Sequence, residues 1–283
     1  MQILPSLIDG LLIGFVYGVA AMGLTLIWGV MSVINLSHGP VMALGMFGTY
    51  LCFMKLGVNP YLALPVVAVL GLLVGLFIYV TAVHRVITAP HLSSLLSTFA
   101  VNMIIIGIGT AVFSTSPHNV DFSMGSLQIG PITMPGTRLM AAFAAVLFTA
   151  ALYVFLYFTR PGKAIRAVAN NRVAAELMGI PSAQVLALSF GLGTMLAAVS
   201  GGLIATFFPF TILSGGPYEL KSFVICVLGG LGNPLGALVG GLLLGGLEGL
   251  IPTFLPVSWV PVVEFGLFIL VLLFRPSGLF GAK

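Results

Sequence analysis

Charged residues are scarce in this sequence: Asp, Glu, Lys and Arg together make up 6% of its 283 residues. A soluble domain carries roughly 25%, so the composition excludes an ordinary water-soluble protein. The formal net charge of +4 comes from only ten basic residues. That number is typical of the basic bias in the cytoplasmic loops of membrane proteins and does not indicate nucleic-acid binding.

Cysteine and the usual catalytic patterns are also missing. Cys52 and Cys226 lie far apart in apolar stretches, which excludes a disulfide framework. The sequence contains no HExxH, CxxC, GxSxG or Walker A pattern. The pair Gly162-Lys163 is followed by alanine, where a phosphate loop needs Ser or Thr. We therefore expect no enzyme activity, no metal site and no cofactor bound by this chain.

Long apolar runs dominate what is present. A helix rises about 1.5 Å per residue, so about 20 apolar residues cross the roughly 30 Å hydrocarbon layer. Backbone groups in lipid must pair within the chain, which leaves helices for runs this uniform. The predicted fold is an all-α integral membrane protein, a polytopic helical bundle of about eight or nine transmembrane spans in one domain, 1–283. The predicted spans are 6–30, 38–56, 61–83, 94–113, 139–158, 183–208, 218–231, 234–256 and 257–274.

Gly and Pro interrupt these spans at two places. Segment 218–231 is short and ends in a Gly- and Pro-rich cluster, which predicts a half-helix or a re-entrant segment. Residues 35–40, which end in Gly39-Pro40, are predicted to break a helix inside the membrane.

Lys and Arg set the predicted orientation. Residues 159–182 hold four of the ten basic residues, so this segment is placed in the cytoplasm. Nine crossings then put Arg85, Arg275 and Lys283 on the same side and the N-terminus outside. Eight spans with one re-entrant loop is the alternative.

Glycines recur every four residues in three stripes, which are Gly10/Gly14/Gly18, Gly232/Gly236/Gly240 and Gly241/Gly245/Gly249. Small residues at this spacing let two helix backbones approach closely. The stripes indicate either packing inside the bundle or a seam with a second subunit.

The segment 159–180 connects two predicted spans and is rich in polar residues. Residues Lys163 to Met178 are predicted as one helix, too charged to cross a bilayer. Such a helix lies on lipid headgroups or docks into a groove of a cytoplasmic partner. The residues alone leave both possibilities open.

This segment, TRPGKAIRAVANNRVAAELMGI, resembles the cytoplasmic coupling segment of the branched-chain amino acid ABC permeases. Three further stretches resemble signatures of that family, closest to its LivH-type subunit: GLTLIWGVMSVINLSHG, GGLGNPLGALVGG and RPSGLFG. The LivM-type and urea permeases share much of the pattern.

The resemblance implies a transmembrane subunit of an ATP-driven importer in the inner membrane of a bacterium. Its expected partners are a second permease subunit, two ATP-binding subunits that hold ATP and Mg, and an external solute-binding protein. The coupling helix, 163–178, would contact the ATPase, and we hypothesise that Arg166 and Arg172 touch it. The coupling residues that the resemblance indicates are Gly162, Lys163, Arg166, Asn170, Arg172, Glu176 and Gly179.

Four polar residues are candidates for the substrate path. Asn35, Ser37 and His38 stand at the predicted break, where non-helical backbone can line a cavity. Asn102 lies in an otherwise apolar span. The structural alternatives are hydrogen-bonded groups at a helix end and, for Asn102, an interhelical hydrogen bond.

Glu248 and Glu264 fall within spans, where a charge costs about 2.5–3.5 kcal/mol on insertion scales. Each should face the interior, a cavity or a partner, and Glu248 beside Gly245 suggests a subunit seam. Asp9 is expected to stabilise a helix N-terminus, and Lys221 to pair locally with Glu219.

The lead prediction is import of branched-chain amino acids with ATP hydrolysed on other subunits. The same importer architecture could carry urea, amides or other amino acids. The alternative class is a self-sufficient secondary transporter that uses Glu248 and Glu264 for ion coupling.

Overall fold

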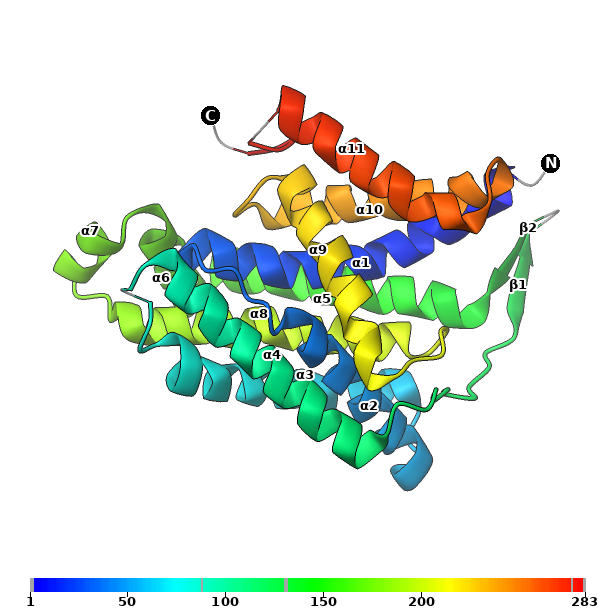
Figure 1. The fold of residues 1–283 in the computed structure, drawn as a ribbon, viewed down its shortest axis with the longest axis horizontal. Helices are drawn as coiled ribbons and strands as arrows, with labels where there is room; N and C mark the ends of the chain where they lie inside the picture. The colour runs from blue at the N-terminus through cyan, green and yellow to red at the C-terminus, as the bar shows by residue number, and fades with distance from the viewer. Residues whose placement is uncertain (1–2, 88, 130–131, 276, 282–283) are drawn as a thin grey trace.

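The computed structural model describes residues 3–87, 89–129, 132–275 and 277–281. Long helices form one bundle, with a two-stranded hairpin at one end and two short helices at the other (Figure 1). The elements are α1 (Ile3–Met31), α2 (His38–Leu56), α3 (Pro60–Ile78), a π-helical turn η1 (Tyr79–Val83), α4 (His91–Phe113), β1 (Ser126–Ile129), β2 (Ile132–Pro135), α5 (Gly136–Phe158), α6 (Arg160–Asn170), α7 (Arg172–Leu177), α8 (Ser182–Ile204), a 3-10 turn η2 (Ile212–Ser214), α9 (Gly215–Gly229), α10 (Pro234–Leu250), 3-10 turns η3 (Ile251–Thr253) and η4 (Val257–Trp259), and α11 (Val260–Phe274).

Eight of the nine predicted spans correspond to long apolar helices. Among the described residues, eight helices are long and apolar enough to cross a membrane. The ninth predicted span is α9, which at 15 residues is as short as its sequence indicates. The helix predicted to reach 208 ends at Ile204, and the α-helix predicted to reach 256 ends at Leu250 and continues as a short 3-10 turn.

The two ends of the bundle fit the predicted orientation. The start of α1 lies near the hairpin, because Asp9 on α1 pairs with Arg138 just after β2. The chain after α11 returns to the other end, where Leu279 N donates to Leu228 O at the end of α9. The chain thus starts and finishes at opposite ends, as nine crossings require. The basic segment lies at the α6–α7 end, and its cytoplasmic side stays a prediction from the Lys and Arg count.

α1 lies at the centre of the bundle and packs antiparallel against α10. Gly10 and Gly14 face Gly245 and Gly241, and a Cβ on any of the four would overlap the backbone of the opposing helix. The prediction of a subunit seam at Gly241 and Gly245 is therefore wrong. These glycines let two helices of the same chain approach closely.

The helices are interrupted at both predicted places, but the first break lies earlier than predicted. Residues 32–37 are not helical, and Gly39 and Pro40, which were predicted to lie in the break, belong to the first turn of α2. Residues 230–233 form the second break. α9 begins at Gly215, which is buried against the backbone of Gly39. Two helix N-termini therefore meet inside the bundle, with α9 crossing in front of α1 in Figure 1.

The prediction of one coupling helix over 163–178 is wrong in its form. The helix starts earlier, at Arg160, and is divided at Asn171 into α6 and α7. Asn171 has extended backbone angles, and its side chain accepts a hydrogen bond from Ala174 N, 3.0 Å away. Asn competes for nearby backbone donors in this way, which ends one helix and caps the next.

Candidate functional site

The break before α2 brings together the polar residues predicted for the substrate path. Asn35 Oδ1 accepts hydrogen bonds from Ser37 N at 3.1 Å and Ser37 Oγ at 2.6 Å. His38 Nε2 lies 3.0 Å from Ala20 O, in the middle of α1. Asn35, Ser37 and His38 are all buried. The break is thus held by its own side chains and by α1.

α4 completes this cluster from the other side. Asn102 Nδ2 donates to Leu36 O at 2.7 Å, and Thr98 Oγ1 accepts from Leu36 N at 3.2 Å. Asn102 therefore makes a hydrogen bond to the non-helical break before α2, and not the predicted bond to another helix. These bonds give partners to the N–H and the C=O of Leu36, which have no helical partners in the break. Whether these residues also contact solute stays a prediction.

Glu219 connects the two helix N-termini. Its Oε2 accepts a hydrogen bond from Gly39 N at 3.2 Å, so a side chain from the second turn of α9 reaches the start of α2. A negative charge is favoured at a helix N-terminus. The predicted pairing with Lys221 is wrong, because residues two apart on a helix point in different directions.

Lys221 instead pairs with both predicted intramembrane acids. Its Nζ lies 2.7 Å from Glu248 Oε2 and 3.8 Å from Glu264 Oε1, and 5.0 Å from the centre of the Tyr17 ring. Glu264 is 3% exposed. Both acids therefore face the interior or a cavity, as predicted, and they share one base.

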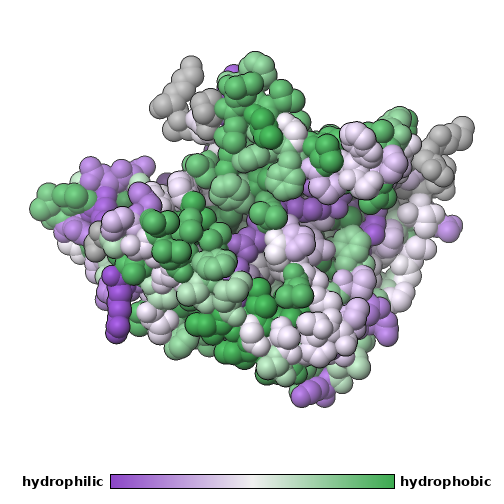
Figure 2. All heavy atoms as spheres, viewed as in Figure 1, coloured by the Kyte–Doolittle hydropathy of each residue, from purple (hydrophilic) through white to green (hydrophobic). Residues whose placement is uncertain are grey.

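The paired acids line an outward-facing groove of about 620 Å³ between the outer ends of α1, α10 and α11. Asp9 and Arg138, which form an ion pair, line the same groove. A second groove of about 460 Å³ lies beside the exposed face of α9 and shares Lys221 and Glu264 with the first. Figure 2 shows hydrophilic residues recessed beneath α11, beside α9. Charged side chains therefore stand in two grooves whose lining is otherwise mostly apolar.

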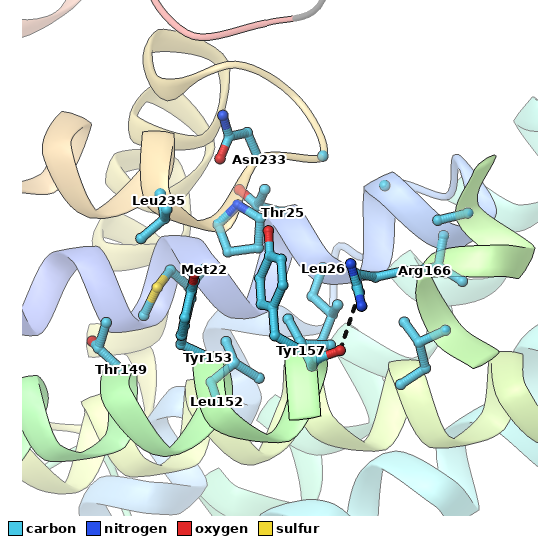
Figure 3. A pocket seen from close by; sticks show the side chains of 17 residues that line it. Met22, Thr25, Leu26, Thr149, Leu152, Tyr153, Tyr157, Arg166, Asn233 and Leu235 are labelled. Carbon is cyan, nitrogen blue, oxygen red and sulfur yellow. Dashed lines mark hydrogen bonds between the residues drawn. The ribbon is translucent and has the colours of Figure 1, made fainter. Parts of the chain in front are cut away.

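α6 is attached to the end of α5. Thr159 caps α6 by accepting from Gly162 N at 3.2 Å, and Gly162 packs so closely on α5 that a Cβ would overlap its backbone. Arg166 turns back as well: its Nε donates to Leu156 O at 3.1 Å, and its guanidinium lies 4.4 Å from the centre of the Tyr157 ring (Figure 3). Gly162 and Arg166 therefore fasten α6 to its own chain.

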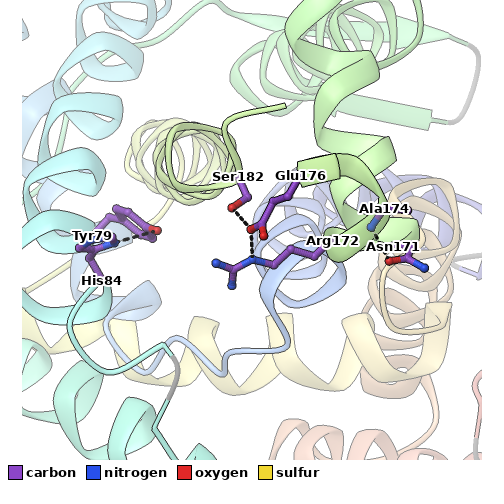
Figure 4. Close-up of polar contacts among 7 residues, drawn as sticks. All are labelled: Tyr79, His84, Asn171, Arg172, Ala174, Glu176 and Ser182. Carbon is purple, nitrogen blue, oxygen red and sulfur yellow. Dashed lines mark hydrogen bonds and ion pairs between the residues drawn. The ribbon is translucent and has the colours of Figure 1, made fainter. Parts of the chain in front are cut away.

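α7 is attached to the start of α8. Glu176 accepts from Ser182 Oγ and from Arg172 Nε at 3.0 Å, as Figure 4 shows. The Ser182 hydroxyl, followed by the Arg172 guanidinium, lowers the pKa of Glu176 from its ordinary value. Gly179, with a φ of +80°, allows the sharp turn between α7 and α8. The predicted residues Lys163, Asn170 and Arg172 are exposed.

The tip of α7 exposes apolar side chains beyond the membrane. Val173 is 68% exposed, and Leu177 and Met178 are each 83% exposed. In Figure 2 this tip forms a hydrophobic end next to the hydrophilic surface of α6 and α7. A soluble surface rarely gathers such side chains without a partner.

A family model described as "Branched-chain amino acid transport system / permease component" matches residues 6–272. The chain belongs to this family. The permease is 30% identical to the high-affinity branched-chain amino acid transport system permease protein LivH of Salmonella typhimurium, over 99% of this chain and 96% of that protein. It is 31% identical to LivH of Escherichia coli K12, with the same coverage, and 31% identical to BraD of Pseudomonas aeruginosa, over 98% and 95%.

The comparison confirms a multi-pass membrane permease subunit as predicted. In this permease the structure adds functional residues that sequence reasoning missed. The sequence pattern predicts Glu219 only as a local partner of Lys221, although its place just after Gly216-Pro217 indicates a helix start. Lys221 gave a clearer signal, since a lone base in a span needs an acid on a neighbouring helix.

Proposed function

We propose that the permease imports branched-chain amino acids through the inner membrane of a bacterium, as part of a complex that hydrolyses ATP on separate subunits. The observation that carries this proposal is the exposed apolar tip of α7 at the cytoplasmic end. Apolar side chains in that position suit the groove of a soluble motor subunit. The names of the relatives support the substrate class.

The attachments of α6 and α7 supply a route for coupling. A force on the exposed end of α7 would be transmitted to α8 through the hydrogen bond between Glu176 and Ser182. It would be transmitted to α5 through α6 and the hydrogen bond of Arg166 to Leu156 O. α8 packs on α1, α2 and α3, including the close contact of Gly45 with Ala198. Closure of a motor would therefore shift helices on both sides of the break.

The proposed solute path follows the grooves along α9. Gly216, Pro217 and Leu220 are exposed there, and Gly216 has open space where a Cβ would be. Charged Lys221 beside such a face is costly in lipid. A second permease subunit that covers this face would enclose the path between two chains, and an external binding protein would deliver solute to the outer groove.

Reconstitution tests the proposal. The complex is placed in proteoliposomes with ATP inside and the solute-binding protein and labelled leucine outside. Leu177→Asp with Met178→Asp should abolish uptake and leave the permease in the membrane, and Val69→Asn on the exposed face of α3 is a control for an exposed apolar change elsewhere. Uptake by the double variant at the wild-type rate would contradict the proposal. Competition by valine and isoleucine, but not by urea or amides, is the expected substrate pattern.

One observation favours a second candidate, ion-coupled transport. The Lys221–Glu248–Glu264 cluster lines an open groove, as a proton- or cation-binding site in a secondary transporter would. Uptake by this chain alone, driven by an ion gradient without ATP and lost in Glu248→Gln, would support that candidate. ATP-dependent uptake that survives an ionophore would exclude it.

A further inference from the structure

A separate cavity of about 140 Å³ lies at the cytoplasmic end, under α6 and between α1, α5 and the loop before α10. Figure 3 shows its lining side chains. Most of them are apolar, including Met22, Leu26, Leu152 and Leu156. Its size is close to the roughly 150 Å³ of a cavity that binds one benzene ring. It can accommodate a short stretch of hydrocarbon.

One positive charge lies at the rim of this cavity. Among the described lining residues Arg166 alone is charged. Its Nε is paired with Leu156 O, but within the described ranges no carboxylate lies in ion-pair distance of the guanidinium. The terminal N–H groups of Arg166 can therefore bind an anion, preferably one that accepts two hydrogen bonds, such as a phosphate. Lys163, one turn earlier on α6, adds a second exposed positive charge.

The cavity opens at the level where headgroups meet hydrocarbon. Tyr153 and Tyr157 stack at 4.4 Å between ring centres near the end of α5, and each is 41% exposed. Paired tyrosines near a span end are typical of the membrane interface. Leu235, 50% exposed at the start of α10, lines the same opening. A ligand can therefore enter from the lipid side.

We propose that the cavity binds an anionic phospholipid of the cytoplasmic leaflet. The phosphate lies against Arg166, with Lys163 nearby, and the first part of one acyl chain fills the space between α1 and α5. The rest of the chain runs over Tyr153 and Leu235. A bound lipid would hold α6 against α5 and α10, whichever solute the permease carries. A basic pocket between transmembrane helices on the cytoplasmic side is suited to such a headgroup.

The test counts lipids and needs no transport. The full chain, purified with the subunits that accompany it, is titrated with phosphatidylglycerol or phosphatidylcholine and examined by native mass spectrometry. We expect phosphatidylglycerol to bind about tenfold more tightly. Arg166→Gln should weaken phosphatidylglycerol about tenfold and leave phosphatidylcholine unchanged. Arg160→Gln, on the same helix but away from the cavity, is the matched control and should change neither by more than about twofold.

Further measurements distinguish a phospholipid from a soluble anion, and the loss of the Arg166 charge from the loss of its contact with Leu156. Arg166→Lys keeps the charge, so it should retain part of the preference for phosphatidylglycerol even though it loses the Leu156 contact. A phosphatidylglycerol with a photoreactive acyl chain should label α5 or α1 near Leu152. The proposal would be overturned if the two lipids bound equally or if Arg166→Gln had no effect. It would also be overturned if hexanoate or inorganic phosphate displaced the lipid at low concentration. The last result would identify a soluble anion as the ligand.

Discussion

Gly39 N donates a hydrogen bond to Glu219 Oε2 at 3.2 Å, although 180 residues separate them in the chain. The bond joins the first turn of α2 to the side chain of Glu219, the fifth residue of α9, inside the bundle. The first turn of α2 presents backbone N–H groups without helical partners, and the Glu219 carboxyl group supplies an acceptor for one of them. The two interrupted spans are therefore linked at the point where each one begins.

Glu219→Ala should destabilise the permease because it removes the acceptor of the Gly39 N–H. We expect a loss of about 1–3 kcal/mol, the usual cost of an unpaired buried polar group. Thermal unfolding in detergent, followed by fluorescence-detected size exclusion, measures the change. Glu219→Gln keeps an acceptor oxygen and should lose less. Equal loss in both variants would show that the negative charge, and not the hydrogen bond, stabilises the start of α2.

Lys221→Met should destabilise the permease more than Glu219→Ala does, since it leaves Glu248 and Glu264 without a cation. Removal of one partner of a buried pair costs about 3–5 kcal/mol. Because the Lys221 and Glu248 side chains keep 20% and 26% exposure, we expect the lower end of that range. Lys221→Met combined with Glu248→Gln should recover part of the loss. If the double variant is no more stable than Lys221→Met in the same assay, the two residues are not coupled.

Gly14→Ala should separate α1 from α10. The added Cβ would meet the carbonyl of Gly241, which is backbone and cannot turn aside. Overpacking of this kind costs about 1–3 kcal/mol. Gly107→Ala on α4 is the matched control, because nothing lies within 4 Å of the new Cβ. It should be neutral or slightly stabilising in the same thermal assay, since Ala favours helix over Gly.

The sequence patterns located the spans because lipid imposes a simple rule on composition and length. The break at 230–233 was also predictable, since Gly and Pro mark it, whereas Gly39 and Pro40 located the first break only approximately because they begin α2 and follow the break at 32–37. Partners such as Lys221 and Glu248 were not predictable, because helix rotation and tilt decide which polar side chains meet. The two readings of the Gly14 and Gly241 stripes could not be separated by spacing alone, since packing within a chain and between chains needs the same small residues.

Acid should loosen α7 from α8. The pKa of Glu176 is lowered in the folded protein, so its bonds to Ser182 and Arg172 contribute fully above the ordinary value of about 4.3 and are lost as pH falls through the lowered pKa. Hydrogen exchange of α7 amides, corrected for intrinsic rates, should rise over that acid range. In Ser182→Ala the rise should begin at higher pH. An identical pH profile would show that Ser182 does not hold the carboxylate.

Asn171→Ala should alter coupling with little loss of stability. Asn171 ends α6 and caps α7, so alanine removes a cap worth about 1 kcal/mol and favours one continuous helix from Arg160. A continuous helix would point the Leu177 tip in a new direction. The distance between spin labels at Lys163 and Val173, measured by double electron–electron resonance, should therefore change. ATP-driven uptake should fall several-fold, while the unfolding temperature of the permease stays nearly the same. Asn171→Asp keeps a capping oxygen and should behave like the wild type. If Asn171→Ala changes the label distance but not the uptake, the angle between α6 and α7 does not transmit force from a motor subunit.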